Sequence, residues 1–206
     1  MSGARPASER PRRTQRERRE ATIAKLVDAT IGALLDVGYA KTTVKEICAR
    51  AALSHGALFR FFPSVLDLVL AASEEVARRQ IAEFERRFAE ASGGEDPIAT
   101  ALHLLRETCR SPTNTVFYEL LVAARTDPDL RSALVQPMRR YYETIRQTAE
   151  SVPGTEALPP GALEVLLFTA IHTFDGEALA RIVLPRPELE EPRLDLLLGL
   201  LAITRR

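Results

Sequence analysis

The chain has 206 residues, 46% of them hydrophobic, which is enough for a substantial core. No stretch of about 18 residues is free of charge, which argues against a membrane span. The Arg-rich start has no apolar run typical of a secretory signal, so we expect a cytoplasmic, nucleoid-associated protein. The two cysteines, Cys48 and Cys109, indicate neither a disulfide framework nor a metal site. We expect both to be reduced, buried thiols, and we expect no metal or cofactor.

Charge is distributed unevenly along the chain. Residues 1–62 contain 12 Lys and Arg against 6 Asp and Glu, a balance of +6, and the remainder contains 16 against 22, a balance of −6. A basic N-terminal third on an acidic body is typical of a protein that meets a polyanion at one end. The alternative is a disordered basic leader on a neutral globule.

Apolar residues recur at spacings of three and four throughout, so the sequence predicts an all-α fold of about nine helices. Residues 1–15, rich in Arg, Pro and Ser, are expected to form a flexible basic arm. The predicted helices cover residues 17–37, 44–51, 55–62, 65–91, 97–110, 113–125, 128–151, 161–183 and 192–204.

Local signals mark the ends of the first three helices. Gly38 supplies a left-handed position after the first helix. Thr43 with Glu46 forms a predicted capping box, and Ser54 is the predicted N-cap of the third helix. Two short helices joined by a tight turn at 43–62 indicate a helix-turn-helix, although an ordinary helical hairpin has the same pattern.

Prolines mark several of the later helix starts, because proline lacks an N–H and its φ suits the first turn. We expect Asp96, Ser111 and Asp127 to cap three of these helices, and Ser64 with Asp67 to begin the fourth helix. The prolines in question are Pro97, Pro112, Pro128, Pro160 and Pro192.

The segment from Gly38 to Leu68 reads GYAKTTVKEICARAALSHGALFRFFPSVLDL. From Ala21 to about Ala72 the chain resembles the TetR family of bacterial regulators, whose pattern is a helix ending in GY followed by TTV..IA..AGVS.GTLY.YF.SK..L. The resemblance implies that the helix at 55–62 lies in the major groove of DNA. It also implies that the second helix and the start of the first contact the DNA backbone.

The expected DNA contacts follow from this resemblance and from side-chain chemistry. A hydroxyl and free N–H groups at a helix N-terminus suit a phosphate oxygen, imidazole can bond a base edge, and a methyl group can contact thymine. Glycine allows close approach of the backbone. Structural capping or packing is the alternative role for several of them. The predicted DNA-binding residues are Thr43, Lys45, Ser54, His55, Gly56, Ala57, Phe59 and Arg60. Phe61 and Phe62 are expected in the core.

Three residues depart from the family pattern. Phe59 stands where Tyr is usual, Val65 where Lys is usual, and Ala52 where the turn glycine is usual. The first two changes remove expected phosphate contacts. Our hypothesis is that an arginine-rich segment compensates for this loss. Its residues are Arg12, Arg13, Arg16, Arg18 and Arg19.

The helices at 161–183 and 192–204 are apolar around most of their circumference, so one face of each needs a partner. The resemblance implies a homodimer through a four-helix bundle of these helices, which would place two recognition helices on a near-palindromic site. A monomer with both helices in its interior is the alternative.

Aromatic and soft side chains in the middle of the body predict a largely apolar cavity for a small-molecule effector. The predicted ligand-binding residues are Phe84, Phe88, His103, Phe117, Tyr118, Met138, Tyr141, Tyr142, Phe168 and His172. Each of them alone is also explained as a core residue, the two histidines included. The resemblance implies that an effector shifts the fourth helix and releases DNA, which makes repression the default expectation.

The expected organisation is a basic arm at 1–15, a helix-turn-helix domain at 16–63, and a helical ligand-binding and dimerisation domain at 64–206. An enzyme is not expected, because no phosphate loop, nucleophile elbow or metal-ligand spacing occurs and the three histidines form no triad. The remaining alternative is a helical protein whose basic arm binds anionic membrane surfaces or a protein partner.

Overall fold

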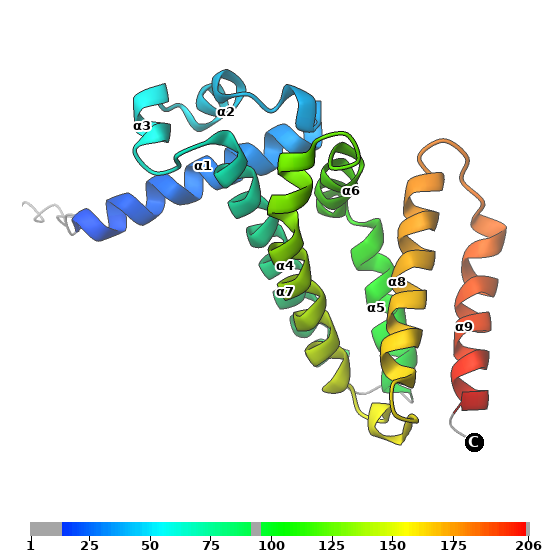
Figure 1. The fold of residues 1–206 in the computed structure, drawn as a ribbon. Helices are drawn as coiled ribbons and strands as arrows, with labels where there is room; N and C mark the ends of the chain where they lie inside the picture. Colours follow the sequence, from blue (N-terminus) through cyan, green and yellow to red (C-terminus); the bar gives the residue numbers. More distant parts are fainter. Residues whose placement is uncertain (1–13, 92–95, 205–206) are drawn as a thin grey trace, which may run out of the picture.

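The computed structural model describes residues 14–91 and 96–204, and all regular structure within these ranges is helical (Figure 1). The prediction of an all-α fold is therefore confirmed. The α-helices are α1 (Gln15–Val37), α2 (Val44–Ala51), α3 (His55–Phe59), α4 (Val65–Glu90), α5 (Pro97–Arg110), α6 (Thr115–Ala123), α7 (Pro128–Glu150), α8 (Ala162–Ala180) and α9 (Glu190–Thr204). The short 3-10 turns are η1 (Tyr39–Lys41), η2 (Pro112–Asn114), η3 (Thr155–Ala157) and η4 (Pro187–Leu189).

The three N-terminal helices lie at one end of an elongated helical body (Figure 1). The long helix α4 descends from α3 into this body and packs against both α1 and α7. Helix α5 packs against α8, and α9 lies at the outer edge beside α8. No helix in the described ranges is long and apolar enough to span a membrane.

Several predicted helix ends differ from the structure. Helix α8 ends at Ala180 and is followed by turns, whereas we expected it to reach residue 183. Helix α9 begins at Glu190, two residues before Pro192. Helix α6 begins two residues late, after η2, and the predicted cap at Ser111 is wrong. The Ser111 hydroxyl lies 3.1 Å from the Thr113 hydroxyl and caps no backbone N–H.

The caps around α2 and α3 are mostly as predicted. Thr43 Oγ1 accepts a hydrogen bond from the Glu46 N–H at 3.3 Å, and Ser54 Oγ accepts one from the Ala57 N–H at 3.2 Å. The second half of the Thr43 box is wrong, because the Glu46 carboxylate accepts from Arg50 at 2.6 Å instead.

A complete capping box occurs instead at the start of α1. The Glu17 N–H donates to Thr14 Oγ1 at 3.2 Å, and the Thr14 N–H donates to Glu17 Oε2 at 2.8 Å. Because the box fixes the first turn, α1 begins at Gln15, inside the predicted arm. The rest of the arm, with Arg12 and Arg13, lies outside the described residues.

One hydrophobic core joins the N-terminal helices to the body. It includes residues of α1, α2 and α3, the upper half of α4, and residues of α6 and α7. Its largest fully buried side chains are Leu26, Leu34, Ile47, Leu58, Leu68, Val69, Val76, Val116, Leu120 and Leu130. Phe61 and Phe62 pack against this core, and Cys48 and Cys109 are free and buried, as the sequence predicted.

The turn between α2 and α3 places a non-glycine residue in the left-handed region. Ala52 has φ 51° and ψ 46°, and it is the only described residue other than glycine with positive φ. A side chain costs about 1–2 kcal/mol in this region. The turn geometry is thus the one that favours glycine, although the chain has alanine there.

We expect Ala52→Gly to stabilise the protein by about 1 kcal/mol in urea unfolding, because it removes the Cβ strain. Ala49→Gly is the matched control, since Ala49 is exposed in the interior of α2. There the same change should destabilise by about 1 kcal/mol. A destabilised Ala52→Gly variant would contradict the strain at this turn.

Candidate nucleic-acid interface and internal cavity

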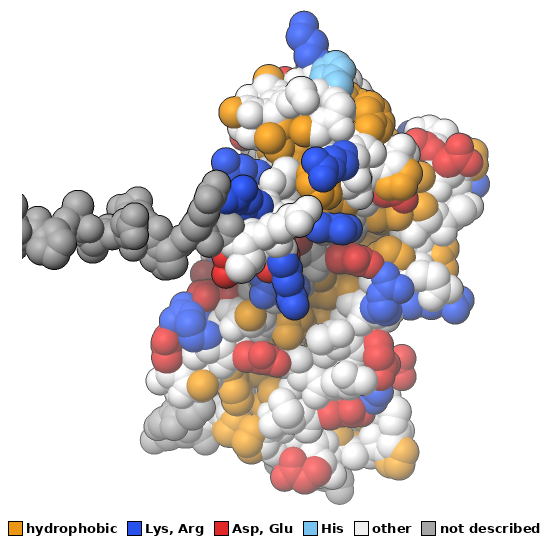
Figure 2. Space-filling view, turned by 90° about the vertical axis from the view of Figure 1, so that its left-hand side faces the viewer, with side chains coloured by type: hydrophobic (Ala, Val, Ile, Leu, Met, Phe, Trp, Pro, Cys, Tyr) orange, Lys and Arg blue, Asp and Glu red, His pale blue; other side chains and the backbone are white. Residues whose placement is uncertain are grey.

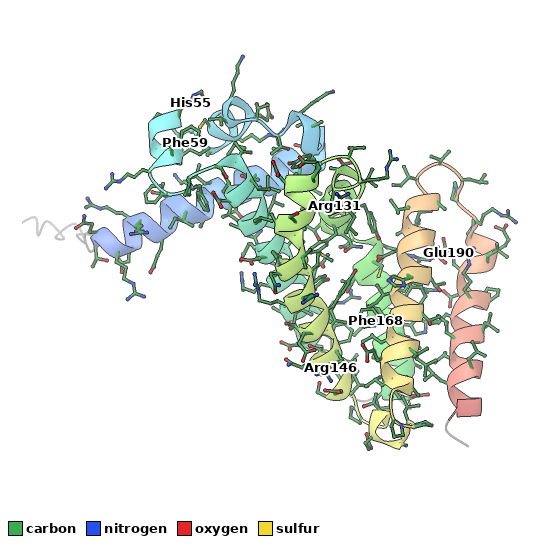
Figure 3. The ribbon with its side chains drawn as sticks, viewed as in Figure 1. His55, Phe59, Arg131, Arg146, Phe168 and Glu190 are labelled. Atoms are coloured by element: carbon green, nitrogen blue, oxygen red, sulfur yellow. The ribbon has the colours of Figure 1, made fainter. Side chains whose placement is uncertain are left out.

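Helix α3 presents a short, exposed surface at the upper end of the molecule. His55 and Gly56 are exposed and Phe59 is 49% exposed, whereas Leu58 is fully buried and anchors the helix (Figure 3). Ala57 is half-buried. The short helix therefore turns most of its predicted DNA-binding residues outward.

The neighbouring predicted residues are also on the surface. Thr43, Lys45, Ser54 and Arg60 are all exposed. A Cβ built on Gly56 would meet no atom within 4 Å, so packing inside the chain does not require glycine there. This surface is free to approach a second molecule closely.

An arginine groove lies beside α3, and the sequence did not reveal it as a unit. Its open volume is about 770 Å³. It is lined by Gln15, Arg16, Arg18, Arg19, Thr22, Arg60 and Phe61. Figure 2 shows Lys and Arg side chains gathered at this end of the molecule.

The arginines of the groove surround one aromatic ring. The guanidinium carbons of Arg19 and Arg60 lie 6.0 and 5.8 Å from the centre of the Phe61 ring. Arg16 pairs with Glu20 at 2.8 Å. Arg18, Arg19 and Arg60 form no ion pair within residues 14–91 and 96–204. Three positive charges without acidic partners among the described residues suit an anion such as a phosphate.

The link between α1 and α2 is held by the body. Glu119 Oε2 on α6 accepts from the Tyr39 N–H at 3.2 Å, and the Tyr39 hydroxyl donates to Asp127 Oδ2 at 3.1 Å. Burial and the Asp127 carboxylate raise the pKa of Tyr39, so the phenol remains a donor. Gly38 has φ 76°, and a Cβ there would lie 2.7 Å from Glu119 Oε2. These contacts fix where α2 begins relative to α6 and α7.

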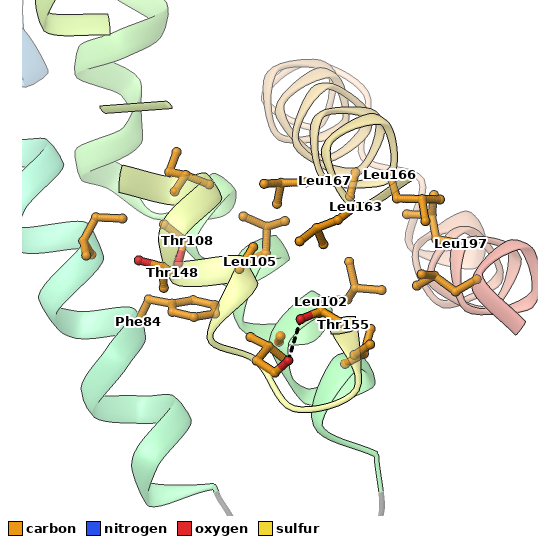
Figure 4. Close-up of a pocket in the computed structure, with 18 of the residues that line it drawn as sticks. Phe84, Leu102, Leu105, Thr108, Thr148, Thr155, Leu163, Leu166, Leu167 and Leu197 are labelled. Carbon is orange, nitrogen blue, oxygen red and sulfur yellow. Dashed lines mark hydrogen bonds between the residues drawn. The ribbon is translucent and has the colours of Figure 1, made fainter. Parts of the chain in front are cut away.

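An internal cavity of about 100 Å³ lies lower in the body, between α4, α5, α7, α8 and α9 (Figure 4). Its lining is mostly Leu and Ile with a few hydroxyl and amide groups, and no lining side chain is Asp, Glu, Lys, Arg or His. Of the predicted ligand-binding residues, Phe84 and Tyr141 line this cavity. None of the leucines that form its walls was a predicted ligand-binding residue.

The other predicted ligand residues lie around the cavity or away from it. Phe117 and Met138, together with Tyr141, line a separate open groove between α4 and α7. Phe88 stacks on Phe84 at 6.0 Å. His103 and His172 are exposed and do not line the cavity.

Tyr142 on α7 and Phe168 on α8 do not line the cavity. The centres of their rings lie 5.2 Å apart in an edge-to-face arrangement; Phe168 is labelled in Figure 3.

Tyr118 belongs to a buried polar network instead of the cavity. Its hydroxyl lies 2.8 Å from Asp175 Oδ1 on α8, and Asn114 Nδ2 donates to the Tyr118 hydroxyl at 2.7 Å. Gln80 Nε2 donates to Asn114 Oδ1 at 3.2 Å. Burial and Asp175 raise the pKa of Tyr118, so its hydroxyl stays protonated. The network joins α4, η2, α6 and α8 in the otherwise apolar interior.

The sequence comparisons fit this arrangement. The family model described as "Bacterial regulatory proteins, tetR family" matches residues 26–72, which contain α2 and α3. An HTH-type transcriptional regulator of Mycobacterium tuberculosis is 41% identical over 189 residues, covering 92% of this chain and 97% of that protein. The chain belongs to the TetR family. It is a transcriptional regulator of the TetR type.

Solved TetR-type structures share the fold. A transcriptional regulator from Rhodococcus sp. Rha1 has a TM-score of 0.65 and 26% identity, over 86% of this chain and 94% of that one. EbrR, a multidrug binding protein solved with imidazole, has a TM-score of 0.61 and 20% identity, over 86% of this chain and 93% of that one.

A buried ionic cluster ties α5 to α8 and α9 in this TetR protein. The side chain of Glu177 on α8 is 4% exposed and pairs with Arg110 and, at 2.7 Å, with Arg193. Burial alone would raise the pKa of Glu177, but the bonds from Arg110 and Arg193 hold that pKa below its ordinary value. Glu177 is one of two glutamates in this largely apolar predicted helix, and the sequence did not distinguish it from Glu164.

The lowered pKa of Glu177 predicts a stability that falls with acid. Its contribution is complete above the unfolded pKa of about 4.3 and is lost as the pH falls through the lower folded value. We expect Glu177→Gln to destabilise by about 3 kcal/mol at pH 7 in urea unfolding, and by less at pH 3.

Glu188→Gln is the matched control. Glu188 is exposed and pairs with Arg186 on the surface, so we expect almost no change in the free energy of unfolding at pH 7. Equal effects of the two substitutions at pH 7 would contradict a structural role of the buried cluster.

Proposed function

We propose that this protein is a homodimeric repressor that binds a near-palindromic operator and leaves it when a small-molecule effector binds. The observation that supports this most is the exposed surface of α3 beside the arginine groove, where Arg18, Arg19 and Arg60 have no acidic partner among the described residues. Helix α3 lies in the major groove, where His55 and Ala57, with Lys45 on α2, face the bases. Double-stranded DNA is the primary partner.

The remaining predicted residues contact the DNA backbone. Thr43 and Ser54 offer hydroxyls at helix N-termini, and Gly56 allows close approach. Phe59 contributes apolar contact without the hydroxyl that the family usually has there. The lost phosphate contacts at Phe59 and Val65 are replaced by the arginine groove, chiefly by Arg19 and Arg60.

We expect Arg19→Ala and Arg60→Ala each to weaken operator binding roughly tenfold per protomer at 0.1 M salt. Each should also reduce the slope of log K against log salt by about 0.9 per protomer, because one phosphate contact is lost. A chain beginning at Thr14, which keeps the α1 cap, measures the separate contribution of residues 1–13, which include Arg12 and Arg13.

The control for these variants is Arg146→Ala. Arg146 lies on the lower part of α7, far from α3, and pairs with Glu143 at 2.6 Å (Figure 3). The Arg146→Ala substitution removes the same charge outside the interface, so the slope of log K against log salt should stay unchanged. Unchanged slopes for Arg19→Ala and Arg60→Ala as well would overturn the assignment of the groove.

The dimer is proposed to form through α8 and α9. One face of α8 is exposed at spacings of four and three, the spacing of helix-packing seams. Its members are Val165, Thr169, His172, Gly176 and Leu179. Leu196 on α9 is 63% exposed. The position of His172 in this stripe favours a role at the subunit interface over a role in the cavity.

We expect Val165→Glu to give a monomer at micromolar concentration by light scattering, because it buries a charge in the apolar seam. Val135→Glu on α7 is the matched control. Val135 is 43% exposed but lies outside both helices, so this variant should remain a dimer. A monomeric wild type, or a dimeric Val165→Glu variant, would contradict the proposed interface.

Release of DNA follows from the position of α4. This helix begins directly after α3, its upper half belongs to the shared core, and its lower half lines the cavity through Gln80, Ile81 and Phe84. We propose a second state of the protein in which α4 and α7 lie farther apart. An effector that binds this state more tightly than the DNA-binding state shifts the protein toward it. The spacing of the two α3 helices then no longer matches the operator.

We keep the division into an arm at 1–15, a DNA-binding domain at 16–63 and a ligand-binding and dimerisation domain at 64–206 as part of this proposal. We also place the protein in the cytoplasm and propose no catalytic activity. Regulatory function in the relative from M. tuberculosis favours DNA over an anionic membrane surface as the target of the basic end.

A further inference from the structure

The internal cavity has two walls of different chemistry. The wall from α8 and α9 is entirely apolar (Figure 4). It consists of Leu163, Leu166, Leu167, Ala170, Leu197 and Leu201. The opposite wall, from α4 and α7, contains the polar groups Gln80, Tyr141 and Thr148 beside apolar side chains. A molecule in this cavity therefore contacts an apolar surface on one side and hydrogen-bonding groups on the other.

The polar wall is centred on Gln80, which is 6% exposed. Gln80 Oε1 accepts from the Tyr141 hydroxyl at 2.5 Å, and Gln80 Nε2 donates to Asn114. A primary amide has a second N–H and further acceptor capacity, so these two bonds do not exhaust it. Burial raises the pKa of Tyr141, and the phenol remains an uncharged donor.

The lining offers no charge to neutralise a buried ion. Burying a carboxylate or an ammonium group without a partner is much more costly than burying a hydroxyl that finds a hydrogen bond. The cavity chemistry thus selects against ions and tolerates one or two neutral polar groups.

We propose that the effector is an uncharged amphipathic molecule. Its apolar part packs on the leucines of α8 and α9, and its hydroxyl, carbonyl or amide group bonds to Gln80 and Tyr141. This inference rests on the proposed function, because it specifies the chemistry of the same effector site.

Tyr141 also lies on the route into the cavity. The open groove between α4 and α7, of about 540 Å³, shares Ile81 and Tyr141 with the cavity lining. An effector that enters from this groove passes Tyr141 and competes for its bond to Gln80. The same event separates α4 from α7, which is the movement that DNA release requires.

The test uses purified dimer without DNA. N-phenyl-1-naphthylamine, an uncharged dye that fluoresces in apolar surroundings, reports occupancy of the cavity. The competitors are 1-octanol, octanoate and octylammonium at pH 7.5, which share one chain and differ in charge. We expect 1-octanol to displace the dye at concentrations at least about thirtyfold lower than either ion.

Two substitutions locate the binding. Ala101→Phe fills the cavity and should reduce dye affinity at least about tenfold, whereas Ala89→Phe, on the exposed end of α4, should leave it unchanged. Tyr141→Phe should weaken the binding of 1-octanol about fivefold and leave the affinity for the dye almost unchanged, because only the hydroxyl is lost.

The proposal would be overturned if octanoate or octylammonium displaced the dye as effectively as 1-octanol does. It would also be overturned by an absence of dye binding, or by dye binding that ignores Ala101→Phe. Operator binding is measured separately. If 1-octanol occupies the cavity and DNA remains bound, ligand-induced release fails while the chemistry of the cavity stands.

Discussion

Burial of one apolar face of α4 is the constraint on which the other features depend. Leu68, Val69, Ala72 and Val76 are at most 1% exposed and pack between α1 and the body helices. Each large side chain of this kind contributes about 1.5–3 kcal/mol through burial. Because the same helix packs on the α1 to α3 unit and lines the cavity, the two ends of the protein share one rigid element. A boundary drawn at residue 63 separates sequence motifs, but it does not separate hydrophobic cores.

The elements that the sequence predicted correctly are those whose ends are set by neighbouring residues. Asp96 and Asp127 cap helices that begin with proline, and α5 runs over the predicted residues. The ends of α6 and α9 depend instead on 3-10 turns that precede them. Such turns depend on contacts made in the folded protein, so periodicity and composition did not reveal them.

The two candidate sites differ in the same way. The surface of α3 is a local motif, and its residues could be named from spacing and capping. The groove joins Arg19 on α1 to Arg60 and Phe61, which directly follow α3. The cavity takes its lining from five helices, and its helical leucines come from α5, α8 and α9. Aromatic content identified Phe84 and Tyr141, but it could not tell which way each helix is rotated. That rotation placed His103 and His172 on the surface.

The small size of the cavity has a consequence for signalling. At about 100 Å³ it is below the roughly 300–1,000 Å³ typical of small-molecule sites. The effector that we propose therefore binds only those protein molecules in which the helices around the cavity have moved apart. The apparent affinity then equals the intrinsic affinity multiplied by the fraction of open molecules. If that fraction is about 1%, a hundredfold higher effector concentration is needed. For the proposed effector, a cavity of this small size therefore sets a dose threshold, and traces of the effector leave the operator occupied.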